Sequence, residues 1–202
     1  MQGLDDMIVL ENVTHIPEDI EDRLTGFTSR VDALGVPVLR VPGSGELAEW
    51  LRDEAAGKGL AGIAMSTELR DQAPELVARL AELGVGVAVP ESAIDAQDAA
   101  LGVNIARMAI VETGSTLLAE DSLAARAIGL LAHTNVVVCR TGDLRPSLVD
   151  AAALLKEMAL RPGGSYGSLV TGPSRTADIE MSLTVGVQGP AKLLIVFVDD
   201  LR

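Results

Sequence analysis

Two polar stretches interrupt an otherwise aliphatic chain of 202 residues, and both contain residue types that can bind or activate a ligand. The first is Glu-Thr-Gly-Ser-Thr at positions 112–116. A carboxylate at a strand end beside a glycine lets a ligand approach closely, and burial would raise the pKa of Glu112. Glu112 could then act as a general base or as a carboxylate nucleophile. The candidate ligand-binding residues of this stretch are Thr113, Gly114, Ser115 and Thr116.

The same five residues also suit an ordinary turn. Gly114 would supply a positive φ, and the hydroxyl groups would satisfy nearby backbone N–H and C=O groups. From the residues alone, the catalytic and the turn interpretations of positions 112–116 both stay open.

The second polar stretch is Thr-Gly-Pro-Ser-Arg-Thr-Ala-Asp-Ile-Glu at positions 171–180, followed by Gly-Val-Gln-Gly-Pro at 186–190. A turn at Gly-Pro and a typical N-terminal cap at Ser174 predict that a helix begins here. Unpaired N–H groups and the positive end of the helix dipole would make this helix start an anion-binding pocket. The candidate ligand-binding residues are Gly172, Pro173, Ser174, Arg175, Thr176, Asp178, Glu180, Gln188 and Gly189.

The charged residues of this second stretch allow a plainer interpretation. Arg175 and Asp178 are three residues apart and would form a local ion pair on the expected helix. Asp178 and Glu180 are two residues apart and would lie on different helix faces, so we do not expect an acid–base pair between them. Positions 186–190 would either line the same pocket or simply turn the chain into its last strand.

The scaffold that positions these stretches alternates between strands and helices over the first hundred residues. Buried apolar runs indicate strands, and apolar stripes ending at glycines indicate helices. This alternation is typical of a parallel sheet with right-handed crossovers, in a single domain over residues 1–202. The expected helices are 17–34, 44–57, 73–83 and a short acidic one at 95–101; the expected strands are 36–41, 60–65 and 85–89.

The middle of the chain changes character, because two short apolar runs flank Gly114 too closely for a crossover. We expect a tight hairpin there. The expected strands after position 100 are 108–112, 116–119, 134–140, a buried one at 168–171 and a last one at 191–198; the expected helices are 123–131 and 146–159.

Composition excludes several classes of function. The formal net charge of −13 and an aromatic content of 2% argue against nucleic acid, which needs clustered cations and stacking surfaces. The same charge disfavours anionic membranes, and no apolar run approaches a membrane span. The start lacks the basic region of a signal peptide, so we expect a cytoplasmic protein without membrane insertion.

Metal and redox sites have little support in the sequence. Cys139 is the only cysteine and lies in an apolar run, so we expect a small buried core residue and no cysteine-based metal or iron–sulfur site. His15 and His133 have no ligand spacing around them, and we expect no metal site.

The two polar stretches together resemble a known family. Glu-Thr-Gly-Ser at 112–115, the Gly-Pro-Ser-Arg-Thr-Ala-Asp-Ile-Glu run at 172–180 and Gly-Val-Gln-Gly-Pro at 186–190 are similar to the LUD (lactate utilization) domain family, in particular its lactate utilization protein C type. The resemblance covers most of the chain. It implies an α/β fold with three α/β/α layers and a mostly parallel sheet, similar to ribose-phosphate isomerases, glucosamine-phosphate deaminases and CoA transferases.

The resemblance also implies a function. Members of the family take part in oxidising L-lactate to pyruvate together with partner proteins that hold iron–sulfur clusters, whereas this chain would bind no cofactor of its own. Relatives usually carry His where this chain has Gln188, which favours hydrogen bonding over proton transfer there. The leading hypothesis is an accessory protein that binds a small carboxylate or phosphate; the alternative is an autonomous transferase or isomerase acting on a CoA thioester or sugar phosphate, with Glu112 as nucleophile or base.

Overall fold

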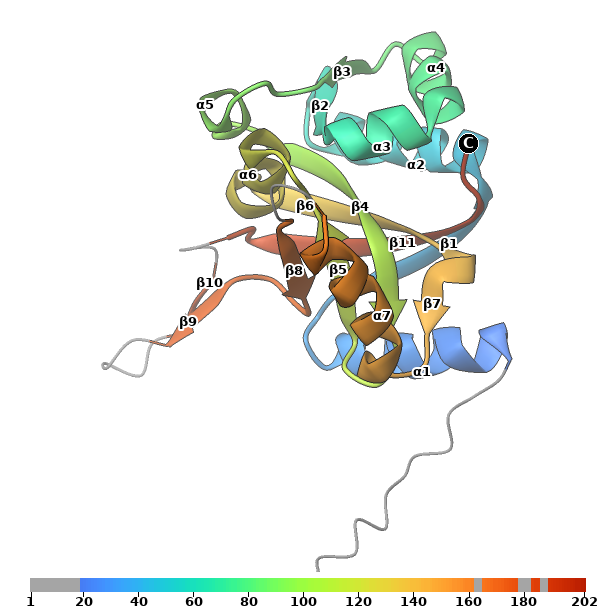
Figure 1. Ribbon diagram of the computed structural model, residues 1–202. Helices are drawn as coiled ribbons and strands as arrows, with labels where there is room; N and C mark the ends of the chain where they lie inside the picture. The colour runs from blue at the N-terminus through green and yellow to red at the C-terminus, as the bar shows by residue number, and fades with distance from the viewer. Residues whose placement is uncertain (1–18, 162–164, 178–182, 186–188) are drawn as a thin grey trace, which may run out of the picture.

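The computed structural model describes residues 19–161, 165–177, 183–185 and 189–202 (Figure 1). Within these residues, nine strands form one mixed sheet, and two further strands form a separate antiparallel ribbon. The sheet has a parallel part in the order β1-β11-β6-β4-β2-β3. Its strands are β1 (Val38–Gly43), β2 (Gly62–Met65), β3 (Gly86–Ala88), β4 (Leu101–Ile110), β6 (Thr134–Arg140) and β11 (Lys192–Asp200).

The long central strand β4 joins the parallel part to a second, antiparallel part. Its first half pairs with β2 and β6, and its second half pairs with β5 (Ser115–Ala119) across the predicted hairpin. β5 then pairs antiparallel with β8 (Gly167–Val170), and the two-residue β7 (Leu144–Arg145) runs parallel to β4. The hairpin around Gly114 is therefore confirmed, and it lies where the sheet changes from parallel to antiparallel.

Helices cover both faces of the sheet, which confirms the predicted α/β class with a mostly parallel sheet (Figure 1). One face packs against α2, α3 and α4 through apolar residues such as Leu47, Leu69 and Leu80. The other packs against α1, where Phe27 and Phe197 meet edge-on with ring centroids 5.3 Å apart, and against α6. The helices are α1 (Ile20–Asp32), α2 (Ser44–Gly57), α3 (Thr67–Gln72), α4 (Pro74–Glu82), α5 (Ala93–Ala96), α6 (Leu123–Leu131) and α7 (Leu148–Ala159), with a 3₁₀ turn η1 (Thr141–Asp143).

A glycine in β4 sets how closely α6 approaches the sheet. A Cβ on Gly102 would lie 2.7 Å from Cγ2 of Ile128 and 2.8 Å from Cβ of Ala132, both closer than van der Waals contact allows. The absence of a side chain at this position lets α6 lie directly over β4. Polar residues of β4 beyond Gly102 on the same face are consequently buried beneath α6.

The elements predicted at 95–101 and 168–171 differ from the structure. The acidic helix expected at 95–101 is the shorter α5, and β4 begins at Leu101, because the mainly apolar run through position 110 is a strand buried at every position except the half-buried Arg107. The strand expected to be buried at 168–171 is β8, but its side chains alternate between exposed and half-buried, because β8 lies at an edge of the sheet.

Candidate functional site

The Glu112 stretch forms the tight turn between β4 and β5, against the C-terminal end of α1. Gly114 has φ +65°, as the turn interpretation predicts. A Cβ at this position would lie 3.0 Å from Cγ1 of Val31 and 3.2 Å from Cβ of Arg30. Both the backbone conformation and the neighbouring helix therefore require glycine here.

Glu112 itself is exposed, so the expected burial of its carboxylate is wrong. Its Oε2 accepts a hydrogen bond of 2.8 Å from the backbone N–H of Leu148, the first residue of α7. A carboxylate at this place satisfies one of the helix's unpaired N–H groups and lies at the positive end of the helix dipole. The contact gives Glu112 a structural role as a cap of α7 supplied from a distant turn.

The structure brings the two polar stretches together through the pairing of β5 with β8. Ser115 Oγ lies 2.8 Å from Thr171 Oγ1, and Thr116 Oγ1 donates a hydrogen bond of 3.3 Å to the carbonyl of Val170. Gly172 packs beside Leu34 at the end of α1. Residues 113–116 and 171–172 therefore belong to one region of the molecule, although their role in binding stays a prediction.

The helix expected after Ser174 is wrong. Residues Arg175–Ala177 form β9, which pairs antiparallel with β10 (Leu183–Val185) in the two-stranded ribbon. The pairing of β9 with β10 depends on residues further along the chain, and it prevails over the local capping signal of Ser174. The proposed anion pocket at a helix start is overturned with it. Asp178, Glu180 and Gln188 lie outside the described residues, as do the side chains of Arg175 and Thr176.

The two ends of the ribbon return to the same place. The N–H of Ser174 donates a hydrogen bond of 3.1 Å to the carbonyl of Pro190. Gly189 has φ +144°, and a Cβ on it would lie 3.0 Å from Cβ of Ser174. The predicted return of 186–190 toward the first part of the stretch therefore holds for the described residues Gly189 and Pro190.

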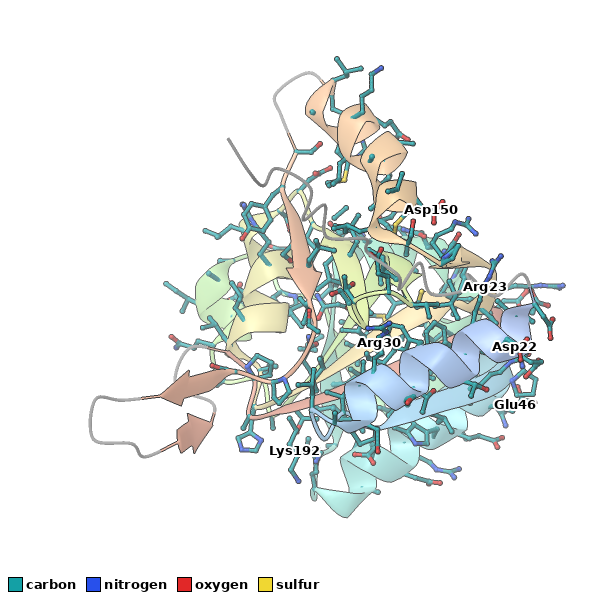
Figure 2. The ribbon with its side chains drawn as sticks, turned by 90° about the horizontal axis from the view of Figure 1, so that it is seen from below. Asp22, Arg23, Arg30, Glu46, Asp150 and Lys192 are labelled. Atoms are coloured by element: carbon teal, nitrogen blue, oxygen red, sulfur yellow. The ribbon has the colours of Figure 1, made fainter. Side chains whose placement is uncertain are left out.

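A pocket of about 310 Å³ opens beside Pro173, where this stretch meets the end of α2 and the start of β11. Lys58 and Lys192 both line it, and these are two of only three lysines in the whole chain. Glu54 also lines the pocket and lies 3.8 Å from the Lys58 ammonium. Figure 2 shows Lys192 on the side of the molecule from which β9 and β10 extend. The pocket lining thus contains two lysines and one glutamate, a formal charge of +1 on a strongly acidic protein.

A second carboxyl group, which the sequence did not single out, lies directly after β5. Glu120 is only 3% exposed, and its carboxyl accepts a hydrogen bond from Nδ2 of Asn104, which also donates 3.2 Å to the carbonyl of Ala125. The pKa of Glu120 is raised to about 8, chiefly because the carboxyl group is buried and in lesser part because Glu68 is nearby, while the Asn104 hydrogen bond and Arg126 act in the opposite direction. Glu120 is therefore mostly protonated at neutral pH.

Glu120 belongs to a buried polar cluster beneath α6. Asn104 lies in β4 and Asn135 in β6, both on the face that α6 covers, and both come close to where a Cβ of Gly129 would lie. Asn104 Oδ1 and both amide atoms of Asn135 have no hydrogen-bond partner among the described residues. The signal in the sequence was a polar residue, Asn104, inside the apolar run that forms β4, since a polar side chain in a buried strand requires a partner.

Other predicted features of the described residues can be checked directly. Cys139 is buried and free, as expected, and burial raises the pKa of its thiol. His133 is exposed, whereas His15 lies outside the described residues. In the part of the chain that the structure describes, His, Cys, Asp and Glu do not gather into a possible metal site. A helix long and apolar enough to span a membrane is also lacking in that part.

Comparison with known proteins decides the family. The LUD domain family matches residues 24–198, which is most of the chain. The chain belongs to the LUD domain family. The matched range includes the Glu112 turn, the Pro173 pocket and Glu120, so all three are features of this LUD domain.

Relatives called lactate utilization protein C are similar in sequence to about half of this LUD domain. Lactate utilization protein C of Bacillus velezensis is 32% identical over 108 residues, which are 52% of this chain and 44% of the relative. Lactate utilization protein C of Geobacillus kaustophilus is 34% identical over 108 residues, covering 52% of this chain and 45% of the relative. The matched segment therefore spans about half the length of these curated relatives.

A solved structure supports the fold. A DUF162 family protein from Deinococcus radiodurans superposes with a TM-score of 0.63, covering 90% of this chain and 99% of that chain at 21% identity. At this identity the likeness concerns the fold alone.

Proposed function

We propose that this LUD domain works in lactate utilization as an accessory protein that binds a small carboxylate and acts together with iron–sulfur partners. The names of the relatives support the pathway. The observation that carries the binding role is the Pro173 pocket, which two of the chain's three lysines line beside the stretch that resembles the family most closely.

The chemistry of the pocket suits a small anion. Ammonium groups form charge-assisted hydrogen bonds with carboxylate oxygens, and a volume of about 310 Å³ is at the lower end for small-molecule sites. The leucines of β11 and the backbone beside Pro173 would pack against the short carbon chain of lactate or pyruvate. The helix expected after Ser174 does not form, so in this proposal Lys58 and Lys192 supply the positive charge that the helix dipole was expected to supply.

The redox step of such a system belongs, in this proposal, to the partners. Iron–sulfur clusters need several cysteine ligands, and the single cysteine of this chain is buried in the core. The chain would then hold or deliver the carboxylate while a partner accepts the electrons.

Ligand-induced stabilisation tests the binding role. A ligand that binds only the folded state raises the melting temperature, by about 5–10 °C when its concentration is 100 times Kd. We expect lactate or pyruvate to raise the Tm of the wild-type protein, and Lys192→Ala to lose most of that shift. The matched control is Lys156→Ala on α7, which removes the one lysine outside the pocket and should keep the shift.

Two results would contradict the proposal. If lactate, pyruvate and phosphate, each compared with chloride at the same ionic strength, all leave the melting temperature unchanged, the proposed binding role is wrong. An equal loss of the shift in both lysine variants would show that net charge rather than the pocket is responsible.

The alternative, an autonomous transferase or isomerase that uses Glu112, has less support. The Glu112 carboxylate is exposed and engaged with the N-terminus of α7, whereas a nucleophile or base needs a desolvated, ligand-facing position.

A further inference from the structure

Open edges of the sheet differ in how they are protected. An edge strand exposes unpaired backbone N–H and C=O groups, and proteins usually block it with charge, proline or short length. β1 carries Pro42 and also Arg40, which is ion-paired with Glu21 and Asp199. β3 has three residues, and β7 has two and carries Arg145. Each of these three edges therefore carries one of the usual protections against pairing with another strand.

The fourth edge, β8, is one residue longer than β3 and lacks the other two protections. Its sequence is Gly-Ser-Leu-Val, without charge or proline, and within the described residues it pairs with β5 alone. Leu169 is 47% exposed, and Tyr166, immediately before the strand, is 44% exposed beneath the guanidinium of Arg126, 4.5 Å from the ring centroid. An exposed apolar edge of this kind is a template for pairing with another strand.

Helix α7 extends the apolar surface beside this edge. It approaches β8 where a Cβ on Gly167 would lie 2.9 Å from Cε of Met158, and Figure 1 shows the helix in front of β5 with β8 beside it. Only Ala151 and Met158 of this helix are fully buried. Other large apolar side chains stay exposed: Leu148, Val149, Leu155 and, just after the helix, Leu160. Exposed apolar patches of this extent mark interaction sites.

The charge of this surface points to its occupant. The segment 147–170, which forms α7 and β8, contains two acidic residues, Asp150 and Glu157, and two basic ones, Lys156 and Arg161, so its formal charge is zero. The whole chain carries −13. This is thus a face on which two copies of the acidic chain can meet without like charges opposed at the contact, and their remaining repulsion is screened by salt.

We propose that a second copy of this chain docks here. The two β8 strands pair antiparallel across a two-fold axis, which is a self-complementary arrangement for an edge strand. Tyr166, Leu169 and the exposed leucines of α7 from both copies cover the junction. The parallel and antiparallel parts of the two sheets then join into one continuous sheet.

Light scattering of the purified full chain, measured across a dilution series, tests this proposal. We expect a mass twice the 21.0 kDa of one chain, with a dissociation constant that decreases as salt is added. Leu169→Lys places a charge at the centre of the contact and should give a mass of one chain. Ala88→Lys places the same charge on the β3 edge and should leave the dimer intact.

A second variant keeps the test decisive if Leu169→Lys fails to fold. Leu155→Lys alters an exposed position of α7 and should weaken the dimer at least tenfold. A wild-type mass of one chain at every concentration would overturn the proposal. A folded Leu169→Lys or Leu155→Lys variant that dimerises as strongly as the wild type would overturn it as well.

Discussion

Two glutamates flank β5, one three residues before it and one directly after it, and their environments are opposite. Glu112 is exposed in a conspicuous motif and caps α7 through the N–H of Leu148. Glu120 is 3% exposed in an unremarkable run and holds a proton at neutral pH through burial. The comparison teaches that a motif and a perturbed carboxyl group need not coincide. In this LUD domain the motif provides the turn and the surface, and the titrating group lies beneath α6.

The largest expected effect belongs to Glu120→Gln, which keeps the shape of the side chain and removes its titration. Because the pKa of Glu120 is about 8 in the folded protein and 4.5 for an ordinary glutamate in the unfolded chain, the folded state binds more protons between these pH values. Stability from this group is therefore fully present below pH 4.5 and is lost as pH rises to about 8. The loss in the wild type is on the order of a few kcal/mol.

Urea unfolding at pH 5, 6.5 and 8.5 measures this loss. The variant should be more stable than the wild type at pH 8.5, and the difference should shrink toward pH 5. Asp199 has a pKa lowered by Arg40 and shifts stability the other way, but it is common to both proteins and cancels in the difference. Glu112→Gln serves as the matched control and should follow the wild-type pH profile. If Glu120→Gln also follows it, the proposed contrast between the two carboxyl groups is wrong.

A smaller effect is expected from Glu112→Gln at constant pH. The amide oxygen can still accept the hydrogen bond from Leu148, and only the charge at the start of α7 is lost. The free energy of unfolding should decrease by about 0.3–1 kcal/mol. Chemical denaturation checks the value, and the melting-temperature shift with lactate or pyruvate should be unchanged. Loss of that shift, or of any turnover that the wild type shows, would instead favour Glu112 as a catalytic group.

Most of the scaffold could be predicted from the sequence. α6 and β6 have the predicted bounds, and the hairpin at Gly114 forms as expected, because local periodicity and glycine chemistry decide such elements. Ser174 misled the prediction, because its capping signal is local whereas the pairing of β9 with β10 depends on residues further along the chain. Propensity at one position is a weak guide where strand pairing competes.

The candidate site could be predicted only in part. The sequence marks residues 112–116 and 171–174, and the structure brings them together. Lys58 and Lys192 were not singled out, because they come from distant elements and meet only in the folded chain. Glu120 could not be recognised either, since its pKa depends on the cover that α6 provides, and that cover depends on the space left by Gly102.

The most direct test of the account is the titration of the glutamate carboxyl carbons, followed by ¹³C NMR in the wild type and in Glu120→Gln. We expect one glutamate signal to titrate near pH 8 and to be absent from the variant. Glu112→Gln should leave that signal in place. If every glutamate in the wild type titrates below about pH 5.5, or if the signal near pH 8 is lost in Glu112→Gln rather than Glu120→Gln, the assignment of the proton-binding carboxyl group to Glu120 is contradicted.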